Sequence, residues 1–255
     1  MRRRIPIIAR ISFVTVMLIL WEAAPRIGLV RASDLPPPST ILPVLWGLLQ
    51  QPRFLADLGY TALEVVTAFL IVAPLALAVG FFLGENHRAE RIFGPGLNLM
   101  IAVPKSVFLP VFILALGIGL TQKVVFAMSL AFFVIVPSAI AAVHSIPKAL
   151  VTAARSFGAG RRQLYFHIYA PAMAPVVLGG LRLGIILTVF GVLFAEMYAS
   201  SVGIGRRIFA WGELGEMPQL FAAVFLIIIL TVSLNEAMQA CENYSRSRFA
   251  LQSDR

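Results

Sequence analysis

The sequence has too few charged residues for a water-soluble protein of its length. Charged residues make up 13% of the 255 residues, whereas hydrophobic residues make up 59%. A soluble domain usually carries about 25% charge. Because so little charge cannot cover a water-facing surface, the chain needs a lipid bilayer as its solvent. The composition therefore predicts an all-α polytopic membrane protein.

Several groups that carry chemistry in other proteins are also missing. Cys241 is the only cysteine, which excludes an intrachain disulfide and a cysteine-based zinc site. No Gly-Lys dipeptide occurs, although a nucleotide-binding P-loop requires one beside Ser or Thr. His, Asp and Glu form no metal-ligand motif and no catalytic grouping. We therefore expect no metal site, no catalytic residue and no bound cofactor, so that any ATP and Mg²⁺ would belong to a partner.

The net charge of +9 does not indicate nucleic acid binding. The basic residues lie in short gaps between apolar runs, a pattern typical of the positive-inside rule and of anionic lipid contact.

Six apolar runs are near the roughly 20 residues that a spanning helix needs. The expected spans are Ile5–Ala24, Tyr60–Leu83, Leu97–Gly117, Lys123–Val143, Val176–Tyr198 and Leu220–Ala240. We see no internal repeat, and the whole chain, 1–255, is expected to form one transmembrane domain. The first span has an alternative interpretation, because three arginines before a short apolar stretch also resemble a cleaved secretory signal. Trp21 and Arg10 favour its retention, as an interface anchor and a snorkelling side chain.

The basic residues also predict the orientation. With the N-terminus inside, thirteen Lys and Arg lie on the inner side and six on the outer side. This imbalance favours cytoplasmic N- and C-termini. Outside the spans, we expect a short interfacial helix over Thr40–Gln50 and an external loop with a short re-entrant piece over Ser201–Pro218.

The longest inner loop, about His144–Pro175, has the pattern of two short helices. Ser145 and Pro147 mark a helix start and Gly158 marks its end. Between them lies one apolar stripe at helical spacing, formed by Leu150, Ala153, Ala154 and Phe157. A second helix, about Arg161–Tyr169, is expected to end before Pro171. The stripe is compatible with packing on the membrane or on the chain itself, and equally with docking in a groove of a partner.

Among the ionisable residues within the expected spans, four are candidates for function, since charge inside a membrane is costly and often functional. Glu64 is expected at a wetted outer surface. Lys105 would lie roughly 12 Å into a continuous helix, either facing a substrate path or paired with a carboxylate from another span. Arg182 is compatible with snorkelling, an ion pair or the path, and Glu196 with a partner base or an external gate.

The inner loop resembles that of binding-protein-dependent ABC importer permeases. Their loop reads Glu-Ala-Ala, three residues, Gly, nine residues, Ile, one residue, Leu-Pro. Here the corresponding residues are Thr152-Ala153-Ala154, Gly158, Ile168, Ala170 and Pro171. The spacing agrees throughout, while Thr152 replaces the glutamate and Ala170 replaces the leucine.

Further motifs resemble the sulfonate, taurine, nitrate and thiamine-precursor branch of that family. They are Leu35–Ser39, Pro104-Lys105 with Leu109-Pro110, Gly117–Gly119, Gly180–Arg182, Glu196-Met197 and Gly203–Gly205. The family-type core would cover about 58–243. The resemblance implies a permease-type fold whose loop helix couples to an ATPase through Leu150, Thr152, Ala153, Ala154, Phe157 and Gly158.

The resemblance also implies a location, partners and a cargo. The chain would be a multi-pass protein of the bacterial inner membrane, assembled with a cytoplasmic ATP-binding-cassette ATPase, an extracytoplasmic solute-binding protein and a second permease copy, by default identical. The cargo would be a small solute, a sulfonate-, nitrate- or taurine-like anion or a thiamine-precursor-like molecule, with Lys105, Arg182 and Glu196 as candidate path residues. The alternatives are an ion-coupled transporter or channel and a membrane-embedded enzyme. The sequence shows neither a midplane relay nor a catalytic grouping for them.

Overall fold

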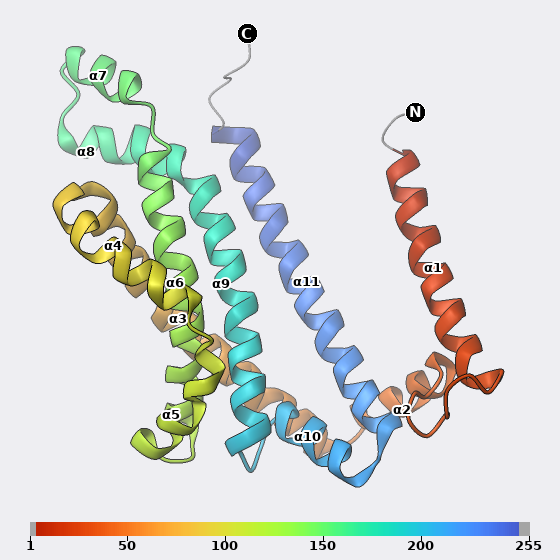
Figure 1. Cartoon of the computed structure of the whole chain (residues 1–255). Coiled ribbons are helices and arrows are strands. Elements are labelled where there is room, and N and C mark those ends of the chain that lie inside the picture. Colours follow the sequence, from red (N-terminus) through yellow and green to blue (C-terminus); the bar gives the residue numbers. More distant parts are fainter. Residues whose placement is uncertain (1–3, 250–255) are drawn as a thin grey trace.

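The structure, a computed structural model, describes residues 4–249, and no strand occurs in that range (Figure 1). The terminal segments 1–3 and 250–255, whose cytoplasmic placement is predicted, lie outside the described residues. In chain order the helices are α1 (Arg4–Arg26), α2 (Pro38–Leu49), α3 (Pro52–Glu85), α4 (His87–Ala102), η1 (Lys105–Phe108), α5 (Leu109–Leu116), α6 (Leu120–His144), α7 (Lys148–Ser156), α8 (Arg161–Leu164), the π-turn η2 (Tyr165–Tyr169), α9 (Ala170–Ala199), α10 (Ile204–Leu214) and α11 (Met217–Phe249).

The described part of the chain contains four helices that are long and apolar enough to cross a membrane. They lie in α3, α6, the continuous helix Arg162–Ala199 and α11. Each contains one of the predicted spans, so four of the six predicted spans are confirmed as helices of spanning length. A fifth span results if α4 and η1–α5 are counted together. The first predicted span is helical as α1, but it is not among the spans identified within the described residues, so the count of six is not reproduced.

The third predicted span is not one straight helix. Residues 87–102 and 105–116 form two helices that meet at an angle of 85°. Pro104 lies in the break, and it has no N–H with which to continue the backbone ladder. The depth of roughly 12 Å expected for Lys105 assumed a continuous helix. Because the helix is broken at Pro104, that depth no longer follows.

Figure 1 shows two ends of the bundle with different contents. The first turn of α1, the last turns of α11, and α7 with α8 lie at one end, called here the α7 end. The opposite end, called the α10 end, contains α2, α5 and α10. The short helix predicted over Thr40–Gln50 is present as α2, and its interfacial location stays a prediction. The expected loop Ser201–Pro218 is instead mostly helical, because α10 occupies its centre.

Helix α6 lies between α3 and α9 at very short range, and small residues make this possible. A Cβ on Gly84 of α3 would meet Val143 Cβ of α6 at 2.9 Å, and one on Gly191 of α9 would meet the Ala127 Cα of α6 at 2.7 Å. Small residues at such crossings let helix backbones pack closely inside a membrane. The three helices form the centre of the bundle.

A buried ion pair joins two of these helices near the α10 end. Lys123 of α6 pairs with Glu64 of α3, and the two side chains are each 3% exposed. Lys123 Nζ also donates to Ser200 Oγ at 3.0 Å, at the end of α9. Glu64 therefore does not lie at a wetted surface as predicted, because it faces a lysine across the α3–α6 contact.

The second helix of the inner loop does not end before Pro171. It continues through the π-turn η2 into α9, with Pro171 in the first turn of α9. A proline there cannot donate to the carbonyl four residues earlier, and a π-turn changes the hydrogen-bond pattern locally, so the chain stays helical. The inner loop is thus an extension of the α9 span.

We predict that separating the buried pair is more harmful than removing it. Lys123→Met leaves the Glu64 carboxylate buried without its cation, which typically costs about 3–5 kcal/mol. Lys123→Met combined with Glu64→Gln removes both charges and should recover part of this loss. The thermal unfolding midpoints of both variants and of Glu64→Gln, measured in detergent, check the prediction. Equal midpoints for the single and double variants would contradict it.

Candidate functional site

Helix α7 forms the outermost part of the α7 end (Figure 1). It begins after Pro147 and ends at Ser156, as the start and stop signals predicted. Gly158 follows with φ of +81°, a left-handed conformation that favours glycine. The amides of Gly158 and Ala159 donate to Arg155 O at 2.9 Å and Ala154 O at 3.0 Å, which closes the helix end.

The predicted apolar stripe faces outward over much of its length. Phe157 is 92% exposed, Ala153 is exposed, and Leu150 and Ala154 are half-buried. The Phe157 ring is therefore available for contact with a partner or with lipid. Thr152 is exposed on the same helix and also lines a cavity beneath it.

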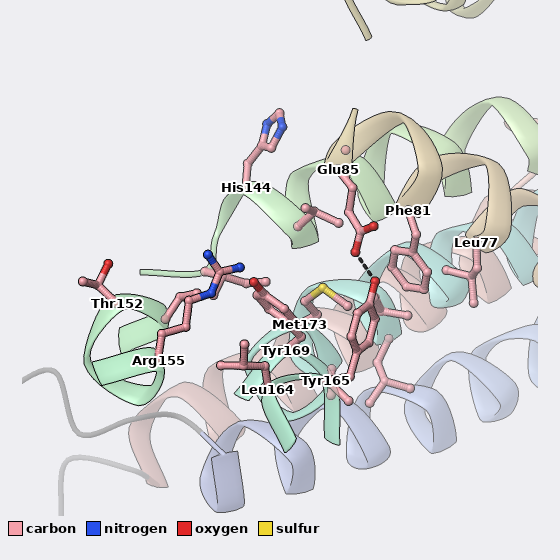
Figure 2. Close-up of a pocket in the computed structure, with 18 residues that line it drawn as sticks. Leu77, Phe81, Glu85, His144, Thr152, Arg155, Leu164, Tyr165, Tyr169 and Met173 are labelled. Atoms are coloured by element: carbon pink, nitrogen blue, oxygen red, sulfur yellow. Dashed lines mark hydrogen bonds between the residues drawn. The ribbon is translucent and has the colours of Figure 1, made fainter. Parts of the chain in front are cut away.

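That cavity lies where four elements meet. It has a volume of about 1230 Å³. Its walls come from the last turns of α3 and α6, from α7, and from the helix that runs from α8 into α9, as Figure 2 shows. On one wall the Tyr165 hydroxyl donates to Glu85 Oε1, which links the inner loop to the end of α3.

Glu196 lies at the other end of the bundle, inside a closed polar cluster. It is fully buried, and its carboxylate accepts from Thr61 Oγ1 at 2.8 Å and from the Gly205 amide at 2.7 Å. Gly203 has φ of +100°, and a Cβ there would collide with the Glu196 carboxylate. Glu196 of α9 thus lies beside the first residues of α10, and its side chain has no exposed surface with which to contact a solute.

A second carboxylate, that of Asp57, also contacts the start of α10. Asp57 of α3 accepts from the Gly203 amide at 2.9 Å and pairs with Arg207 of α10. Thr61 Oγ1 accepts from the Ile204 amide at 2.9 Å. The amides at the N-terminus of α10 thus meet carboxylate and hydroxyl oxygens of α3 and α9, an arrangement that satisfies the free donors of a helix start.

Lys105 lies at the bend between α4 and η1. Its ammonium donates to Met100 O at 2.7 Å and lies 4.9 Å from the centroid of the Phe133 ring. Among the described residues no carboxylate pairs with it, so the alternative of an ion pair with a carboxylate from another span is wrong. The side chain caps the end of α4 and remains partly exposed.

Arg182 forms an ion pair with Glu242. Its Nε lies 3.4 Å from Glu242 Oε2, which joins α9 to α11. The Glu242 side chain is only 8% exposed. Of the three alternatives left open for Arg182, the structure contains the ion pair.

The structure does not bring Lys105, Arg182 and Glu196 together. Each contacts different residues, on different elements. Sequence reasoning missed the contacts of Asp57 and Thr61 with the start of α10 and the ion pair of Glu64 with Lys123. The available signal was that these four polar residues all lie near the predicted outer ends of the second and fourth spans. Among the described residues, no group of three or more His, Cys, Asp or Glu could hold a metal ion.

Comparison with known proteins agrees with this architecture. The sequence profile of the family described as "Binding-protein-dependent transport system inner membrane component" matches residues 73–249. The taurine transport system permease protein TauC of Escherichia coli (strain K12) is 26% identical over 237 residues, covering 91% of this chain and 86% of that protein. The riboflavin transport system permease protein RibX of Chloroflexus aurantiacus is 31% identical over 223 residues, covering 87% and 83%.

The fold has a solved counterpart. The chain superposes on a chain of the MetNI methionine ABC transporter in an inward-facing conformation with a TM-score of 0.63 and 17% sequence identity. The match covers 77% of this chain and 99% of that chain, and at this identity it shows the fold alone. Together with the profile match, these similarities show that this chain belongs to the binding-protein-dependent transport system inner membrane components, the permease subunits of ABC importers.

Proposed function

We propose that the chain carries a small solute across the bacterial inner membrane and is driven by a separate ATPase that docks on α7. The observation that carries the proposal is the apolar stripe of α7, which extends beyond the spans and ends in an exposed Phe157. A helix laid into a groove of a partner is a common recognition mode. The ATPase would bind ATP and Mg²⁺, since this chain has no P-loop.

The remaining parts of the proposal follow the family. A solute-binding protein delivers the cargo at the α10 end, and a second, identical permease completes the path. The α7 end is cytoplasmic, as are both termini. ATP binding and hydrolysis then bias the permease pair between inward-facing and outward-facing states.

The cargo is proposed to be a small anion of the sulfonate, taurine or nitrate kind, with a thiamine-precursor-like molecule as the alternative. The permease TauC, for a taurine transport system, and a putative aliphatic sulfonates transport permease, SsuC of Bacillus subtilis, support the anion. RibX, from a riboflavin transport system, supports a heterocycle. The ammonium of Lys105, which has no carboxylate partner among the described residues, favours the anion.

The orientation is tested by labelling single cysteines from each side of the membrane. In a Cys241→Ser background, Gly160→Cys at the α7 end should react with an impermeant thiol reagent only from the cytoplasmic side. Asp34→Cys, in the turn between α1 and α2, should react only from outside. Both positions are exposed. Labelling of the Gly160 position from outside would overturn the orientation and the docking of α7 together.

Coupling is tested at the end and on the stripe of α7. Gly158→Val forces a β-branched residue into a left-handed conformation. Ala154→Trp places a large ring on the docking stripe. Each variant should lower ATP-driven uptake at least about tenfold, which corresponds to about 1.4 kcal/mol, while membrane insertion remains normal. Gly94→Ala is the control, since a Cβ there meets nothing within 4 Å. Normal uptake by both variants would exclude α7 as the coupling helix.

The role of Lys105 is tested by removing its charge. If the ammonium attracts an anion in the path, Lys105→Met should lower taurine or alkanesulfonate uptake, while assembly with the ATPase and basal ATP hydrolysis persist. Lys105→Arg keeps the charge and should retain more uptake. Loss of assembly in Lys105→Met would show instead that the contact with Met100 O at the bend is structural.

A further inference from the structure

The break between α4 and η1 lies at the mid-level of a spanning helix. Lys105 Nζ is 4.9 Å from the centroid of the Phe133 ring. Phe133 lies near the centre of α6, whose 25 residues run from Leu120 to His144. At about 1.5 Å per residue, Phe133 is roughly 20 Å from the start of that helix. Because α6 is long and apolar enough to cross a membrane, the break and the Lys105 ammonium lie near the middle of the apolar layer.

Lipid is not a suitable environment for this break. Pro104 interrupts the backbone ladder, so carbonyl groups at the end of α4 and amides at the start of η1 lack helical partners. The Lys105 ammonium satisfies one of them, Met100 O, and no carboxylate in the described part of the chain neutralises it. Irregular backbone and charge at this depth are tolerated inside protein or beside water. The region around the break is therefore covered by protein or water rather than by lipid.

An apolar stripe begins at the break and runs along α5. This α5 stripe consists of Val107, Val111, Leu114 and Ile118. Their exposed fractions run from 57% for Val111 to 87% for Leu114. The opposite side of α5 is buried, where Leu109 lies in one cluster with Phe126 of α6. Within the described residues, α5 thus packs by one side and leaves the stripe uncovered.

The spacing of the α5 stripe favours a second copy of this chain as its cover. The four residues follow one another at intervals of four, three and four, which is the spacing of a seam between two helices. In a two-fold pair both chains use the same patch, so an apolar stripe meets an apolar stripe. Such a pair also shields the break from lipid. It leaves two Lys105 side chains facing a shared space, where their like charges favour water or an anion between them.

We propose that the α5 stripe packs against the same stripe of a second copy, and that the break at Pro104 lines a water-filled space between the two chains. The proposal rests on the proposed function, in which two identical permeases form the path, and it assigns the surface on which they meet. Pairing is measured without ATPase, nucleotide or solute. It therefore holds or fails independently of the coupling by α7 and of the cargo.

The test is disulfide crosslinking in membrane vesicles. In a Cys241→Ser background, Leu114→Cys and Val111→Cys are oxidised with copper phenanthroline, and the covalent dimer is quantified on a non-reducing gel. A disulfide requires the two Cα atoms to come within about 7 Å of each other. The matched control is Val232→Cys, an exposed apolar position on α11, which Figure 1 shows on the far side of α9 from α5. We expect at least one stripe variant to yield at least about tenfold more dimer than this control.

A second measurement tests for water at the break. Ser106→Cys, in the same background, places a thiol on η1 with little change in size. The thiolate is the reactive form of cysteine, and it needs water to form. Ser106→Cys should therefore react with N-ethylmaleimide at least about tenfold faster than Val232→Cys, which faces lipid.

Two results would overturn the proposal. If neither stripe variant yields more dimer than Val232→Cys at matched expression, the second copy packs on another face or is absent. If Ser106→Cys reacts as slowly as Val232→Cys, no water-filled space runs along the break. Rapid reaction of Ser106→Cys without stripe crosslinking would also reject the pairing, because it would assign the water to a crevice within a single chain.

Discussion

The close approach of α6 to both α3 and α9 is the constraint on which the rest of the structure depends. The Cβ positions of Gly84 and Gly191 are already occupied by atoms of α6, so larger residues there would push the helices apart. In lipid, helices gain little from the hydrophobic effect and associate through close packing and polar contacts. Here both are present, because α6 meets its neighbours through the small-residue crossings and through the buried pair of Glu64 and Lys123.

At the α10 end, the polar cluster around Glu196 joins the start of α10 to α3 and α9. Glu196 and Thr61 come from positions 135 residues apart in the chain, and together they accept hydrogen bonds at the start of α10. A buried carboxylate is tolerated when its oxygens accept hydrogen bonds. The cluster therefore fixes α10 relative to α3 and α9, and the surface of α10 is positioned by residues that lie inside the bundle.

The elements that could be predicted from the sequence are those with a local signal. Long apolar runs identified α3, α6, α9 and α11, and Pro147 with Gly158 gave the start and end of α7. The continuation of η2 into α9 was missed because Pro171 resembles a helix stop, whereas a π-turn accommodates it. The 85° bend at Pro104 was missed because apolar composition does not reveal whether two helical pieces are collinear. The partners of Glu64, Arg182 and Glu196 depend on which helices meet, and no local pattern contains that information.

The break at Pro104 has a mechanical consequence. A continuous helix transmits rotation and translation along its hydrogen-bond ladder, but η1 and α5 share no such ladder with α4. The hydrogen bond from Lys105 Nζ to Met100 O crosses the gap. The position of α5 therefore depends on its side-chain packing against α6, where Leu109 lies in a buried cluster with Phe126, and not on a helix that continues from α4.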